Sequence, residues 1–86
     1  FYLEARQFER SIEVLESALE IVPGYPKFEN NLGTAQLRSG NLAAARAAFE
    51  RALAGAAPEE RPTIRANLER VAALERASAN PAPAGR

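Results

Sequence analysis

The strongest constraint on the fold of this chain is an internal repeat with a period of 34 residues. When the sequence is shifted by that distance, residues of similar size and polarity coincide. The matched pairs are Leu3 with Leu37, Phe8 with Leu42, Ser11 with Ala45, Leu15 with Phe49, Ala18 with Ala52, and Leu19 with Leu53. A fixed period of roughly 20–50 residues predicts stacked copies of one supersecondary unit, each of which buries apolar surface against the next.

Within each copy the apolar residues follow the spacing of an α-helix. Phe8, Ile12, Leu15 and Leu19 recur at every third or fourth position, as one face of a helix requires. Alanine, the best helix former, is abundant, whereas valine, isoleucine and threonine are scarce. We therefore predict an all-α fold of antiparallel helices joined by short connections. The expected helices span 1–6, 8–21, 26–39, 42–54 and 62–78.

Prolines, glycines and asparagines mark the predicted turns. Pro26 suits the first turn of a helix because its missing N–H has no partner there. Gly40 followed by Asn41 predicts a tight turn in which Asn41 is the N-cap of the next helix. Pro62 is placed to open the last helix.

The chain at this point resembles the tetratricopeptide repeat family, whose period is also 34 residues. The positions that carry the resemblance are Leu32-Gly33, Gly40 at the turn, Ala45, Phe49 and Ala52 in the following helix, and Pro23 and Pro58 near the ends of the two copies. The resemblance implies pairs of antiparallel helices that stack into a superhelix. Glu29 and Gln36 stand where the family commonly has aromatic residues, and an unrelated helical bundle is the alternative.

Two glycines seven residues apart need separate explanations, because glycine weakens a helix interior by about 1 kcal/mol relative to alanine. The resemblance implies that Gly33 lies where a partner helix passes too close for a Cβ atom. Ala45 and Ala52 would be the small residues that permit this approach. Gly40 would lie just past a helix end, where a left-handed backbone favours glycine.

The expected organisation is one repeat domain over residues 1–78, followed by a flexible tail over residues 79–86. Residues 1–25 would form a partial first repeat, 26–59 a second repeat and 60–78 a capping helix. Because Phe1 aligns with a point midway through the first helix of a repeat, we expect the chain to be the carboxyl-terminal part of a longer array. Phe1, Tyr2 and Leu3 would then form an apolar edge through which two copies could associate.

The resemblance also implies a concave groove lined by the first helix of each repeat, which commonly holds a peptide or a helix. The residues expected to face it are Lys27, Asn30, Asn31, Thr34, Leu37, Arg38, Thr63, Asn67 and Arg70. Asn31 and Asn67 occupy the same repeat position, where an amide can pair with any peptide backbone. Local hydrogen bonds or solvent contact are the alternative for these two residues, and solvated charges the alternative for Lys27, Arg38 and Arg70.

Composition argues against several other functions. Eleven basic and eleven acidic residues balance, which is unlike the basic footprint of a nucleic-acid-binding protein. No apolar run approaches the length of a membrane span. Histidine and cysteine are both absent, so the commonest general base and the thiolate ligands of metals are excluded. The pairs Glu9 with Glu13 and Glu16 with Glu20 are expected on a solvated helix face.

The sequence therefore predicts a non-catalytic scaffold that binds a protein or peptide partner, with no cofactor, no metal, no nucleic acid and no membrane insertion. An accessory segment of a larger enzyme and a self-assembling module are the alternatives. The composition leaves the cellular compartment open.

Overall fold

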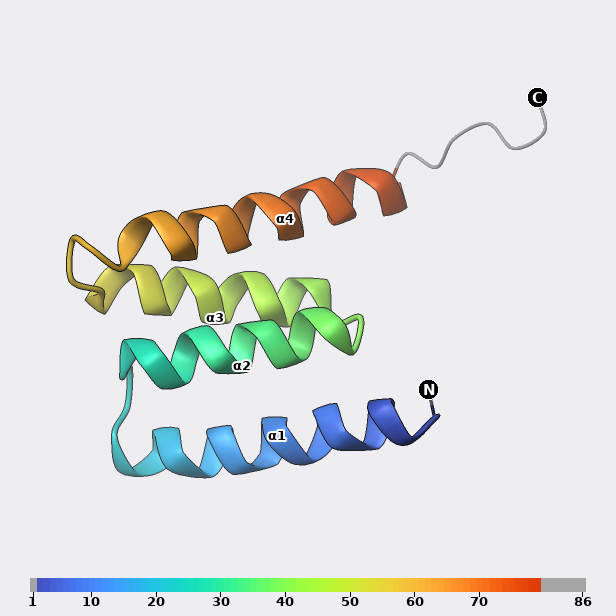
Figure 1. Ribbon diagram of the computed structural model, residues 1–86, viewed down its shortest axis with the longest axis horizontal. Coiled ribbons are helices and arrows are strands. Elements are labelled where there is room, and N and C mark those ends of the chain that lie inside the picture. The colour runs from blue at the N-terminus through green and yellow to red at the C-terminus, as the bar shows by residue number, and fades with distance from the viewer. Residues whose placement is uncertain (1, 80–86) are drawn as a thin grey trace.

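A computed structural model describes residues 2–79, with side chains for residues 6–78, and every regular element in that range is an α-helix. The helices are α1 (Tyr2–Ile21), α2 (Pro26–Arg38), α3 (Leu42–Gly55) and α4 (Arg61–Ala79). Each runs antiparallel to the one before it, as Figure 1 shows. The all-α prediction is confirmed, and the bounds expected for the last three helices agree within one residue.

The first helix differs from its prediction. The expected helices over 1–6 and 8–21 are one continuous helix, so the predicted interruption near Arg6 is wrong. In the repeat, Arg6 aligns with Gly40, the glycine of the turn after α2. Arginine and glutamine are good helix formers, and the stretch from Tyr2 to Ile21 contains neither glycine nor proline, so nothing local ends the helix. Only the part of α1 from Phe8 onward therefore corresponds to α3.

The turn between α2 and α3 depends on Gly40. Gly40 has φ +93°, the left-handed conformation that the sequence predicted for it. The amide of Asn41 donates to the carbonyl of Gln36 at 2.8 Å, and that of Gly40 donates to Leu37 at 3.1 Å. These two bonds form a Schellman motif, which satisfies the last carbonyls of α2. Asn41 is the N-cap of α3 as predicted, although its side chain donates to the hydroxyl of Ser39 instead of capping the helix.

Helices α2 and α3 approach each other closely at Gly33. A Cβ atom added to Gly33 would lie 2.6 Å from Cε1 of Phe49, too near for any real side chain. Ala45, Phe49 and Ala52 are fully buried. The predicted role of Gly33 is therefore confirmed, and Ala45 and Ala52 lie in the core as small, fully buried residues. Ile64 and Val71 of α4 complete the core cluster on the other side of α3.

Helix α1 is covered less than α3. Helix α3 lies between α2 and α4, whereas α1 packs against α2 alone among the described helices. Phe8, Leu15 and Leu19 of α1 are only half-buried, and Val14 is 66% exposed. One side of α1 is thus left without a helix beside it (Figure 1).

Candidate protein-binding surface

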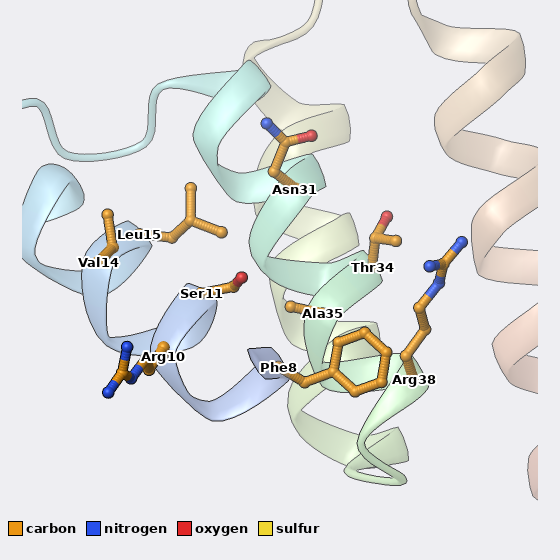
Figure 2. A pocket seen from close by; sticks show the side chains of 9 residues that line it. All are labelled: Phe8, Arg10, Ser11, Val14, Leu15, Asn31, Thr34, Ala35 and Arg38. Carbon is orange, nitrogen blue, oxygen red and sulfur yellow. The ribbon is translucent and has the colours of Figure 1, made fainter. Parts of the chain in front are cut away.

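A hollow of about 550 Å³ lies between α1 and α2. We call it the α1–α2 hollow. Its lining residues are Phe8, Arg10, Ser11, Val14 and Leu15 from α1, and Asn31, Thr34, Ala35 and Arg38 from α2. In Figure 2, Phe8, Ser11 and Leu15 rise from α1 towards the α2 side chains. The hollow therefore combines an apolar lining with polar groups at its ends, as is usual for a recognition site.

A second, smaller hollow of about 340 Å³ lies where α2 and α4 begin, and we call it the α2–α4 hollow. It is lined by Pro26, Lys27, Asn30, Glu59, Glu60, Thr63 and Ile64. One lysine and two glutamates meet there, so its charge is mixed. The carboxylate of Glu60 already accepts a hydrogen bond from the backbone amide of Ala57 at 3.2 Å.

An amide pair joins α2 to α4 between these surfaces. The Nδ2 group of Asn67 donates to Oδ1 of Asn30 at 3.1 Å. The hydroxyl of Thr34 donates to the backbone carbonyl of Asn30 at 3.0 Å. Asn67 is therefore occupied in holding two helices together. Asn31, its counterpart in the repeat, is exposed and has no hydrogen-bond partner among the described residues.

The residues expected in one groove are thus divided between the two hollows, and some of them line neither. Asn31, Thr34 and Arg38 line the α1–α2 hollow, and Lys27, Asn30 and Thr63 line the α2–α4 hollow. Arg70 is exposed on α4 but lines neither hollow.

Leu37 was expected to face the groove, but it packs against the core and lines a different depression near Leu74. Its apolar side chain is better placed beside Leu42 than in water.

The apolar edge expected at the amino-terminal end lies outside the described residues. It involves Phe1 and the side chains of Tyr2 and Leu3.

Sequence reasoning missed the contribution of α1 to the larger hollow. Phe8, Ser11 and Leu15 were used to detect the repeat but were not assigned to a site. Their counterparts Leu42, Ala45 and Phe49 pack in the core, where the ring of Phe49 meets Gly33 of α2. Their alignment with core residues of α3 could have identified them, because in the described residues α1 is packed on one side only and its matching residues stay accessible.

The two departures from the family pattern lie inside the fold. Glu29 is 3% exposed and its Oε2 accepts a hydrogen bond from Nε of Arg51 at 3.0 Å. Gln36 is also buried. One oxygen of each side chain, Oε1, has no hydrogen-bond partner among the described residues. Glu29 therefore belongs to the α2–α3 interface, and both residues are buried away from the exposed surface.

The predicted carboxylate pairs lie on the surface of α1. The glutamates of the two carboxylate pairs, at residues 9, 13, 16 and 20, are all exposed, as predicted. In residues 2–79 no group of three or more acidic, histidine or cysteine side chains is arranged to hold a metal ion. None of the helices in that range combines the length and hydropathy needed to cross a bilayer.

Comparison with known families gives one match. The model of the tetratricopeptide repeat family matches residues 2–68, which is most of the chain. Neither the curated proteins nor the solved structures gave a significant match. The match includes α1, the Gly33–Phe49 contact and the first part of α4. Together with the 34-residue period and the antiparallel helix pairs, it shows that this chain belongs to the tetratricopeptide repeat family.

Proposed function

We propose that this protein is a non-catalytic scaffold that binds a peptide or a helix of another protein along the exposed face of α2. Domains of the tetratricopeptide repeat family generally mediate protein–protein interactions. The observation that carries the proposal is the α1–α2 hollow, which exposes Asn31 and Arg38 beside an apolar lining. Because helices hold these side chains in place, binding costs little ordering of the scaffold itself.

The two asparagines have different roles in this proposal. Asn31 offers a free donor and acceptor to a partner, and it would pair with backbone or amide groups whatever their sequence. Asn67 acts indirectly, because its bond to Asn30 fixes α4 beside α2. Lys27 and Arg38 lie at opposite ends of α2 and add attraction for acidic groups near the two hollows.

The test is a comparison of exposed variants in a binding assay. Partners captured by cross-linking would be identified and then titrated against the purified chain by calorimetry. Asn31→Ala combined with Arg38→Ala should weaken binding by at least tenfold while leaving thermal unfolding unchanged. Arg65→Ala, an exposed residue of α4 that lines neither hollow, is the matched control. Equal affinities for the double variant and the control would refute the assignment of this surface.

Self-assembly is a second candidate function. It is favoured by the exposed apolar side chains of α1, since Val14 is 66% and Ile21 is 82% exposed. Apolar residues that stand together on one helix often mark an interaction site. Sedimentation velocity over a wide concentration range tests it: a monomer throughout would eliminate this candidate, and Val14→Glu should abolish any dimer that appears.

A further inference from the structure

The direct polar connection between α2 and α4 is one side-chain hydrogen bond. The Nδ2 group of Asn67 donates to Oδ1 of Asn30 at 3.1 Å, and both residues are half-buried. Among residues 6–78, whose side chains the structure describes, no other hydrogen bond and no ion pair joins these two helices. Most of the packing of α4 is instead against α3, which lies between α2 and α4 (Figure 1). The distance between α2 and α4 therefore depends on this bond and on the position of α4 on α3.

The surface on which α4 rests has little relief. Ile64 and Val71 are the residues of α4 in the buried core cluster, and the same cluster contains Ala45, Ala52 and Ala56. Ridges of side chains that fit into grooves fix the angle between two packed helices. Methyl groups project little from a helix, so these alanines resist a tilt of α4 less than long side chains do.

A second tether holds the other end of α4. Nη2 of Arg46 on α3 lies 2.9 Å from Oε2 of Glu75, which is in the last part of α4. The α2–α4 hollow lies at the opposite end, where α4 begins. The Arg46 side chain is 51% exposed, and exposed ion pairs of this kind are weak. Because this pair joins α4 to α3, it leaves the distance from α4 to α2 to the asparagines.

We propose that the Asn30–Asn67 bond is a latch that sets how far the α2–α4 hollow opens. Asn30 lines that hollow, which holds about 340 Å³ with the bond formed, near the lower end of the range for ligand sites. When the bond breaks, α4 tilts away from α2 at its beginning and the hollow widens. This inference does not depend on the proposed function, because it concerns the separation of two helices whatever binds between them.

The strength of the bond suits a reversible latch. Both amides are partly accessible, so water replaces the bond when it breaks and its net contribution is small. A hydrogen bond of this kind changes the ratio of closed to open molecules by roughly two- to tenfold. A ligand that binds the open form better by the same factor reverses this preference. A group too large for the closed hollow is such a ligand.

The test measures the separation of α2 and α4 with spin labels, which the absence of cysteine from the sequence makes site-specific. Tyr25→Cys and Arg65→Cys place labels on two exposed residues that do not line the hollow. Tyr25→Cys with Glu50→Cys on α3 is the reference pair. Pulsed electron paramagnetic resonance on the 86-residue chain gives the distribution of distances for each pair, with and without Asn67→Ala.

Loss of the Asn67 amide should raise the ratio of long to short distances between residues 25 and 65 by roughly two- to tenfold. The distances of the reference pair should stay the same. Asn31→Ala is the matched control, because Asn31 is exposed and has no hydrogen-bond partner among the described residues. Asn30→Asp keeps an oxygen acceptor for Asn67 and should retain the short distances.

Three results would overturn the latch. They are unchanged distances in Asn67→Ala, an equal change in Asn31→Ala, and an equal change in the reference pair, which would indicate general loosening of the fold. Long distances in Asn30→Asp would also contradict it, because the acceptor is still present. None of these results bears on the binding assay for Asn31 and Arg38, so the latch and the proposed function can fail separately.

Discussion

Replacement of Gly33 by alanine tests the close approach on which the fold depends. The new Cβ atom would lie 2.6, 2.7 and 2.9 Å from three atoms of the Phe49 ring, all shorter than real contacts allow. Phe49 is fully buried, so the ring cannot turn into solvent and the two helices must separate. Overpacking of this kind costs about 1–3 kcal/mol, and this site belongs at the upper end of that range. Alanine recovers about 1 kcal/mol of helix propensity, and this gain leaves a net loss of about 1–2 kcal/mol.

The assay is urea unfolding followed by far-ultraviolet circular dichroism. A second measurement isolates the cause: in a Phe49→Leu background the clash is relieved, so Gly33→Ala should become neutral or stabilising. The two changes then show a coupling free energy of about 1–3 kcal/mol in a double-mutant cycle. If Gly33→Ala alone raises the free energy of unfolding, or if the effects of the two changes simply add, the proposed steric contact is not what fixes the α2–α3 distance.

Three further predictions concern single contacts and use the same unfolding assay. Gly40→Ala should destabilise the chain by about 1–2 kcal/mol because its φ of +93° is strained for any residue with a Cβ atom, and no loss would contradict the left-handed turn. Arg51→Ala should lower the free energy of unfolding by about 1–3 kcal/mol because it leaves buried Glu29 without its partner, whereas Glu29→Leu should be nearly neutral. A larger loss for Glu29→Leu than for Arg51→Ala would refute this interpretation of the pair. Asn67→Ala should cost about 0.5–1.5 kcal/mol through loss of its bond to Asn30, and an unchanged midpoint would show that this bond does not hold α4 in place.

The sequence alone determined the features that depend on near neighbours in the chain. The Schellman turn at Gly40 needs only a glycine and the last turn of the preceding helix, so it could be predicted from a few residues. Pro26 begins α2 for a similarly local reason. The resemblance to the tetratricopeptide repeat family extended these local predictions, because it implied that Gly33 lies against a partner helix. The break predicted near Arg6 is absent, because the residues on both sides of it favour a continuous helix.

The tertiary structure alone decided which side chains meet across helices. The Asn30–Asn67 bond and the Glu29–Arg51 pair join residues far apart in sequence, and both depend on how each helix is rotated about its axis. That rotation is set by packing over the whole interface, which no short pattern encodes. For the same reason the single groove expected from the sequence divides into two hollows on either side of α2. The open face of α1 also appeared only in three dimensions, because exposure depends on which helices stand beside it.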